Sequence, residues 1–144
     1  MGSLSEEINL SLVKMAAEAL RRQHQITWWP TITKEDVTEP VLEMAEYVYK
    51  AREAGLDKRS ECSYAGSLFV SATLEKKDRK YASDVETVNK IYLAGMKLAG
   101  DMCDGLDRAK KDLNPRSYVH AFEELKQRLP KLVWEEYQKA EYST

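Results

Sequence analysis

The chain has 144 residues, of which 43% are hydrophobic and 32% charged, with only 6 Gly and 4 Pro. A chain of this length buries roughly two-thirds of its unfolded surface, so one core is sufficient without a metal or a disulfide. The 22 basic and 24 acidic residues leave a net charge of −2. This balance excludes a chain-wide cationic field for nucleic acid or anionic membranes, so any such contact has to be local.

The N-terminal segment carries acidic residues, Glu6 and Glu7, where a secretory signal peptide requires positive charge. No apolar run approaches the roughly 18 residues of a membrane span. We therefore expect no membrane partner and an intracellular, cytoplasmic location or a place in an assembled particle. The two cysteines, Cys62 and Cys103, follow no CxxC or Cys/His metal spacing, so buried thiols are expected, with a disulfide as the alternative.

The first predicted element is a helix over about 5–24, because apolar residues recur there at helical spacing. An ordered aromatic connector is expected over about 25–38, since β-branched residues beside Pro30 oppose helix. Thr33 and Asp36 offer a cap for a first turn, but we expect the second helix to open around Pro40 and to end at Gly55. The apolar run over 62–74 is compatible with a helix or a strand, and helix is preferred because the chain offers no second strand.

A long amphipathic helix is predicted over about 84–113. Its apolar residues recur at spacings of four and three, which is typical of a helix that packs on other helices. The repeating residues are Val88, Tyr92, Gly95, Ala99, Met102, Leu106, Ala109 and Leu113. Ser83 with Glu86 forms a capping-box signature at the start, and Asn114 followed by Pro115 supplies a stop.

Two residues of this helix, one glycine and one leucine, are candidates for contact with another helix or another chain. Gly95 lies in the apolar seam, where a missing side chain lets another backbone approach. We expect a close crossing inside the bundle there, with a crossing between subunits as the alternative. Leu93 falls within the charged stripe, where an exposed leucine marks a candidate contact with a second chain. The charged stripe also contains three predicted ion pairs, in each of which an acidic residue lies four positions before a basic one. They are Glu86 with Lys90, Asp104 with Arg108 and Asp107 with Lys111.

The last predicted element is a C-terminal helix over about 115–141 that is broken or kinked at Pro130. Together the elements predict an all-α fold, a single-domain bundle of about five helices over residues 1–144. No internal repeat interrupts this pattern.

Several acidic residues raise the question of a metal site. Asp101, Asp104 and Asp107 form a DxxDxxD pattern, and carboxylates one turn apart can share a divalent cation. Asp104, however, lies opposite the apolar seam, whereas helical metalloenzymes build their sites inside the bundle. We therefore expect solvated acids, with no metal, no cofactor and no catalytic residue.

Two enzyme families nevertheless offer resemblances. Glu43 and Glu46 form an ExxE pattern that, together with Asp101 and Asp104, resembles the acidic motifs of all-α nucleotide pyrophosphohydrolases, which implies metal-dependent hydrolysis. Arg116 and His120, four residues apart, resemble the Arg-to-His motif of the HEPN ribonucleases, which are helical bundles that cut RNA as dimers. A small helical-bundle enzyme of one of these two kinds is the alternative function.

A short basic junction is the candidate nucleic-acid contact, since basic residues beside a tyrosine hold phosphates while the ring stacks on bases. Its residues are Lys76, Lys77, Arg79, Lys80 and Tyr81. A solvated face is the alternative reading of this junction.

Aromatic residues supply the candidate partner contacts. Trp28 and Trp29 are adjacent on the connector, and Trp134 and Tyr137 lie on the C-terminal helix, where large rings with polar tips suit contact surfaces. With Leu93 they form the predicted partner-binding set. The sequence thus favours a non-catalytic structural or scaffolding protein that self-assembles or binds a partner protein, in a narrower version a coat-like or nucleoprotein-like subunit that contacts nucleic acid.

Overall fold

The structure is a computed structural model that describes residues 10–26, 33–74 and 85–142. These residues form five helices and no strand, so the predicted all-α bundle is confirmed. The helices are α1 (Leu10–Ile26), α2 (Lys34–Glu53), α3 (Lys58–Leu74), α4 (Val85–Asp112) and α5 (Pro115–Tyr142). None of these helices is both long enough and apolar enough to cross a membrane.

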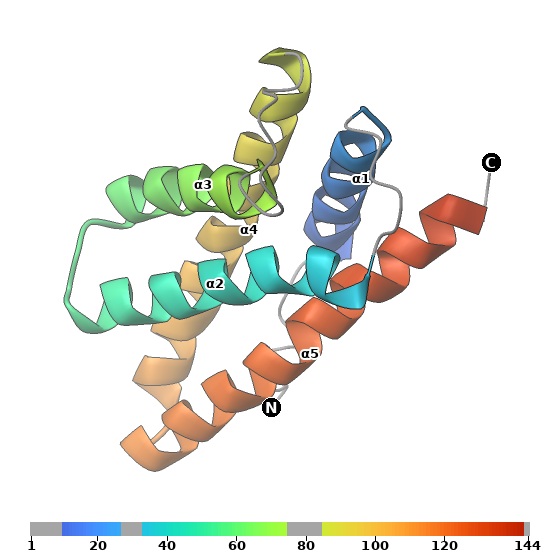
Figure 1. Cartoon of the computed structure of the whole chain (residues 1–144). Helices are drawn as coiled ribbons and strands as arrows, with labels where there is room; N and C mark the ends of the chain where they lie inside the picture. The colour runs from blue at the N-terminus through green and yellow to red at the C-terminus, as the bar shows by residue number, and fades with distance from the viewer. Residues whose placement is uncertain (1–9, 27–32, 75–84, 143–144) are drawn as a thin grey trace.

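The short turn after α2 folds α3 back beside it, and this hairpin packs across α4 (Figure 1). The helix α5 runs diagonally along the other side of α2, and α1 packs against both α4 and α5. The most extensive contact between two helices joins α3 and α4. All five helices therefore share one core.

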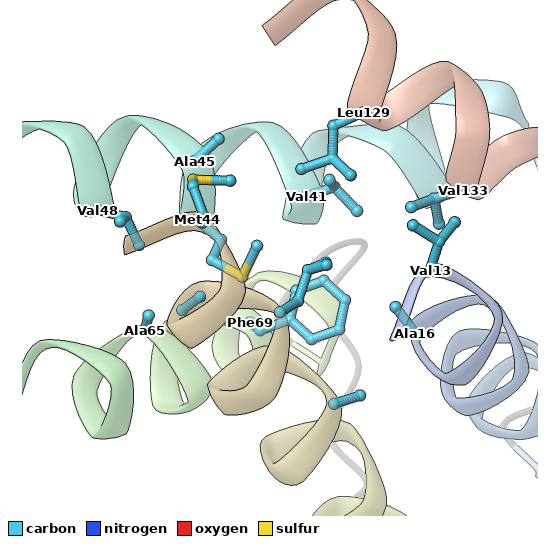
Figure 2. Packing of buried hydrophobic residues seen from close by; sticks show 14 of the residues in the cluster. Val13, Ala16, Val41, Met44, Ala45, Val48, Ala65, Phe69, Leu129 and Val133 are labelled. Atoms are coloured by element: carbon cyan, nitrogen blue, oxygen red, sulfur yellow. The ribbon is translucent and has the colours of Figure 1, made fainter. Parts of the chain in front are cut away.

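The core is aliphatic over most of its extent. Val13 of α1 faces Val133 of α5, and Val41 of α2 faces Leu129 of α5, as Figure 2 shows. The ring of Phe69 from α3 lies near them, fully buried, and is one of the largest side chains without solvent exposure. Burial of apolar side chains from every helix is the main force that holds such a bundle together.

The start of α2 differs from the prediction. Thr33 is the N-cap: its Oγ1 accepts from the backbone N–H of Asp36 at 3.3 Å, and its own N–H donates to Asp36 Oδ2 at 2.9 Å. This reciprocal capping box begins the helix at Lys34 and leaves Pro40 buried inside it. The connector expected over 25–38 is accordingly shorter, because α1 continues to Ile26; residues 27–32 lie outside the described ranges.

The end of α2 agrees with the prediction. Gly55 adopts a left-handed backbone with φ of 73°. Its N–H donates to the carbonyl of Arg52, and the N–H of Leu56 donates to the carbonyl of Ala51, both at 3.2 Å. This pair of bonds is a Schellman motif, which satisfies the last carbonyls of the helix and requires a residue that tolerates positive φ.

The C-terminal helix corrects a second expectation. α5 is one element from Pro115 to Tyr142, so the break expected at Pro130 is absent. A proline inside a helix removes one backbone hydrogen bond and crowds the preceding turn. Here Pro130 and both of its apolar neighbours on that face, Leu129 and Val133, are buried, and this burial offsets the cost.

Candidate functional site

The densest group of ionisable side chains lies where α2, α3 and α4 meet. Arg52 of α2 reaches across to α4, where its Nη2 is 2.9 Å from Asp107 Oδ2 and its Nε is 3.1 Å from Asp107 Oδ1. Its Nη1 donates to Glu61 Oε2 of α3 at 3.2 Å. The planar guanidinium thus binds one acid in bidentate fashion and a second acid on another helix, a geometry that lysine cannot supply.

Glu61 is the buried member of this group, with a side chain only 1% exposed. One oxygen, Oε2, accepts from Arg52 and from the Cys103 thiol, the latter at 3.7 Å. The other oxygen, Oε1, has no hydrogen-bond partner among the described residues. A buried carboxylate satisfied on one side only is costly, so the ion pair with Arg52 has to compensate.

The electrostatics of the group follow from burial and pairing. Burial lowers the pKa of the Arg52 guanidinium, but its hydrogen bonds to Glu61 and Asp107 outweigh burial and raise that pKa overall. Burial also raises the pKa of both cysteine thiols, most strongly that of Cys103. Arg52 therefore stays charged and the thiols stay protonated at neutral pH.

Two of the three aspartates of α4 pair with basic residues on other helices. Asp104 pairs with Lys58 of α3 and Asp107 with Arg52 of α2, whereas the sequence had predicted partners within α4 itself. The predicted pair of Glu86 with Lys90 is found, at 3.2 Å. Within the described part of the chain, no three His, Cys, Asp or Glu side chains are grouped so that they could hold a metal ion.

The acidic motifs that resemble the pyrophosphohydrolases do not converge. Glu43 and Glu46 are exposed on α2, and Glu46 lies 3.8 Å from Lys126 of α5. Asp104 faces α3 instead. The two motifs are therefore directed at different helices, and the shared cation of that chemistry would have no common ligand set among them.

The pair that resembles the HEPN motif lies near the start of α5. Arg116 and His120 are both exposed there, one turn apart. Both side chains reach the solvent, so water has access to the histidine. General acid–base work on RNA would then depend on a second chain that encloses the site.

The predicted partner-binding residues meet different environments. Leu93 is 39% exposed on α4, so its side chain is accessible from solvent. Trp134 is partly buried and stacks on Tyr137, with ring centroids 5.9 Å apart. Tyr137 is only 4% exposed and belongs to the core, so it is not offered to a partner in this conformation.

The remaining predicted contact residues lie outside the described part of the chain. They are the connector residues Trp28 and Trp29 and the basic set Lys76, Lys77, Arg79, Lys80 and Tyr81.

Sequence reasoning missed the outer face of α3. Arg59, Ser60, Ser63, Tyr64 and Ser67 line an open depression of about 460 Å³ on this face. Tyr64 is 57% exposed, and its ring rests against that of Tyr47 of α2, with centroids 4.8 Å apart. The serines recur at spacings of three and four, and this helical spacing is the sequence signal that marks the face.

The serine hydroxyls on this face are held in place. Ser63 Oγ and the hydroxyl of Tyr92 on α4 lie 2.6 Å apart, and Ser67 Oγ donates to the carbonyl of Ser63 at 3.3 Å. Ser60 Oγ donates to Asp57 Oδ2 at 3.2 Å. The face is therefore pre-ordered, polar at its rim and aromatic at Tyr64.

Comparison of the chain with protein-family models, with curated proteins and with solved structures finds no match in any of the three.

Proposed function

We propose that the protein is a non-catalytic helical scaffold that associates with copies of itself, with the outer face of α3 as a principal contact. The observation that carries this proposal is Tyr64, a large ring that is 57% exposed yet supported from behind by Tyr47. Tyrosine and arginine are enriched at the centre of protein interfaces, because a ring held in one position buries much area at little entropic cost.

The surroundings of Tyr64 suit a helix from a second chain. Ser60, Ser63 and Ser67 are small, so another helix can approach the backbone of α3 closely there. A two-fold axis through this face would place Tyr64 against Tyr64 of the second copy, as in the commonest kind of homodimer. Arg59 at the rim supplies hydrogen-bond donors for carboxylates of the second copy.

The charges between the helices support a structural role rather than catalysis. Arg52, Glu61, Asp104 and Asp107 are engaged with partners on neighbouring helices. Charges arranged in this way fix the relative position of α2, α3 and α4.

The proposal is tested by the mass of the purified full-length chain in solution. Light scattering over a range of protein concentrations is expected to give a dimer or larger assembly that dissociates on dilution. Tyr64→Ala is expected to weaken association about 10-fold to 100-fold, the usual loss at a central aromatic contact. The matched control is Val119→Ala on α5, which is 47% exposed and lies on another helix, and it is expected to leave the mass unchanged.

Leu93 marks the second face to be tested, as the sequence predicted. Leu93→Glu is expected to leave the fold intact and to reduce the mass only if α4 also contributes to the assembly. The absorbance ratio of the same samples reports bound nucleic acid, which is the narrower, nucleoprotein-like version of the proposal. A monomeric mass at every concentration, with and without added nucleic acid, would contradict self-assembly.

A further inference from the structure

The two cysteines of the chain meet at the crossing of α3 and α4. Cys62 of α3 is 9% exposed and Cys103 of α4 is fully buried. The Sγ of Cys62 lies 3.7 Å from the position that a Cβ at Gly100 would occupy, one turn before Cys103. Cys103 is near the same turn of α3, since its Sγ lies 3.7 Å from Oε2 of Glu61, the residue before Cys62. The helix crossing thus brings together two cysteines that are 41 positions apart in the sequence.

The crossing is unusually close, which is what allows this contact. A Cβ at Gly66 would lie 2.7 Å from the backbone oxygen of Tyr92, and a Cβ at Gly95 would lie 2.7 Å from Cβ of Phe69. Both distances are shorter than an ordinary van der Waals contact, so α3 and α4 approach nearly backbone to backbone. Cysteines on helices at this separation are within the reach that a disulfide requires.

A carboxylate stands beside this pair of thiols. Cys103 donates to Glu61 Oε2, with 3.7 Å between sulfur and oxygen, and Glu61 is the residue before Cys62 in α3. Its second oxygen, Oε1, is buried and has no hydrogen-bond partner among the described residues. The carboxylate is therefore placed to accept a proton from the Cys103 thiol.

We propose that Cys62 and Cys103 form a redox-responsive pair that a peroxide converts into one intramolecular disulfide between α3 and α4. In the first step, the Cys62 thiol loses its proton and the thiolate attacks one oxygen of hydrogen peroxide. The O–O bond breaks, Cys62 sulfenic acid forms, and the departing hydroxide takes up the proton to become water. In the second step, the Cys103 sulfur attacks the sulfenic sulfur and displaces the hydroxyl as water, while the Cys103 proton passes by way of Glu61. Two thiols and one peroxide thus give one disulfide and two waters, and the two electrons lost by the sulfurs reduce the peroxide.

Cys62 is the sulfur that reacts first. It retains some solvent exposure, whereas Cys103 has none. Burial raises the Cys62 thiol pKa, but the nearby Cys103 thiol and the ammonium of Lys58, one turn earlier in α3, act in the opposite direction on that pKa. The dithiol is consequently the resting form, and oxidation follows sustained exposure to peroxide rather than brief contact.

The disulfide would tie the two helices that have the most extensive contact in the fold. It would close a loop of about 40 residues and so restrict the unfolded chain, provided that the geometry of the crossing is kept. The expected consequence is a thermal unfolding midpoint that is higher in the oxidised protein by up to about 10 °C.

The experiment treats the folded, full-length chain with hydrogen peroxide, then alkylates the remaining thiols in denaturant and measures the intact mass. The expected result is a monomeric chain that has lost two hydrogen atoms and carries no alkyl group, with reduction restoring both sites. Two alkylated thiols after treatment would overturn the proposal. A disulfide that links two chains, seen as a dimer on a non-reducing gel, would also overturn it.

Single variants separate the roles of the two sulfurs. Cys103→Ser is expected to leave Cys62 as a sulfenic acid that dimedone traps, whereas Cys62→Ser is expected to leave Cys103 unreacted and alkylatable. The reverse pattern would contradict the assigned order of reaction. Glu61→Gln is expected to slow disulfide formation at least several-fold without slowing the dimedone reaction of Cys62, and equal rates would remove Glu61 from the second step. The wild-type measurement stands even if a variant fails to fold, and it is independent of the assembly through Tyr64.

Discussion

The crossing of α3 on α4 and the crossing of α2 on α5 bury their surfaces by opposite means. At the first, glycines remove side chains so that the backbones nearly touch, and an ion pair and two thiols fill what remains. At the second, large rings do the packing: Tyr49 of α2 stacks on Phe122 of α5 with centroids 4.1 Å apart and planes 14° from parallel. The first crossing depends on shape and charge, and the second on apolar area.

This difference determines how each crossing responds to change. Stacked rings and aliphatic side chains can shift by a few tenths of an ångström, so an interface built from them adapts to substitution. A backbone oxygen or a Cβ cannot move without moving a helix, and a buried charge cannot lose its partner without remaining in an apolar place. The α3–α4 crossing should therefore be the sensitive one.

The largest effect is expected from Arg52→Met. This substitution leaves the buried Glu61 carboxylate without its cation and also frees Asp107. Loss of one partner from a buried pair should lower the free energy of unfolding by about 3 kcal/mol, measured by urea denaturation at neutral pH. Lys58→Met, which removes the exposed partner of Asp104, is the control and should cost less than about 1 kcal/mol.

The double variant Arg52→Met with Glu61→Met decides whether charge or packing is responsible. Replacing both members of a buried pair by apolar side chains of similar size is often neutral, so most of the lost stability should return. If the double variant is as unstable as Arg52→Met alone, the contribution of Arg52 comes from packing and not from pairing.

An intermediate effect is expected from glycine substitutions in the two helices of this crossing. Gly66→Ala places a Cβ 2.7 Å from the backbone oxygen of Tyr92, and Gly95→Ala places one 2.7 Å from Cβ of Phe69. Each should cost about 2 kcal/mol by overpacking, even though alanine is the better helix former.

Gly100→Ala is the matched control on α4, because its added Cβ would meet only Cys62 Sγ, at an ordinary 3.7 Å. It should increase stability by up to about 1 kcal/mol through helix propensity. Thermal unfolding of the three single variants thus tests whether the added methyl group lowers stability at Gly66 and Gly95 but raises it at Gly100. Equal effects at Gly66, Gly95 and Gly100 would show that the crossing is looser than the structure indicates.

The sequence revealed the seam of α4 but not its partner. Spacings of three and four placed Gly95 on the buried side and correctly favoured a crossing inside the bundle, because periodicity reports which face of a helix is covered. It could not name Phe69 as the contact, since which helix covers a face is a property of the tertiary arrangement. The same limit explains why Asp107 was assigned to Lys111 within its own helix when Arg52 of α2 binds it.

The candidate sites were less predictable than the fold. Glu61 lies one helical turn before Ala65 and two before Phe69, on the buried side of α3, so its burial could have been anticipated from spacing alone. The predicted start of the second helix was wrong because two local rules competed there. Thr33 and Asp36 form a complete capping box, and this outweighs the preference of Pro40 for the first turn of a helix. Tyr64 gave no sequence signal, because exposure of one aromatic residue depends on which faces the neighbours leave open.

The last prediction compares both crossings in a single measurement, the loss of stability at alkaline pH. Cys62 and Cys103 have raised pKa values in the folded protein, relative to 9.0 for a free thiol, because they are buried. Above about pH 9 the unfolded chain therefore binds fewer protons than the folded one, and stability falls as the pH rises. Each thiol contributes at most about 1.4 kcal/mol per pH unit.

The tyrosines of the α2–α5 crossing add a second phase at higher pH. Burial raises the pKa of Tyr49 and Tyr118 above the ordinary tyrosine value of 10.0, so their contribution to stability is lost only as the pH rises beyond about 10. Urea denaturation under reducing conditions, repeated between about pH 8 and pH 11, should show a slope that begins near pH 9 and steepens near pH 10. Cys103→Ala should reduce the slope of stability against pH near pH 9 and leave the steepening near pH 10 unchanged. Tyr49→Phe should reduce the steepening near pH 10 and leave the slope near pH 9 unchanged. If Cys103→Ala leaves the slope near pH 9 unchanged, the α3–α4 crossing admits water to its thiols, and its contrast with the aromatic crossing is lost.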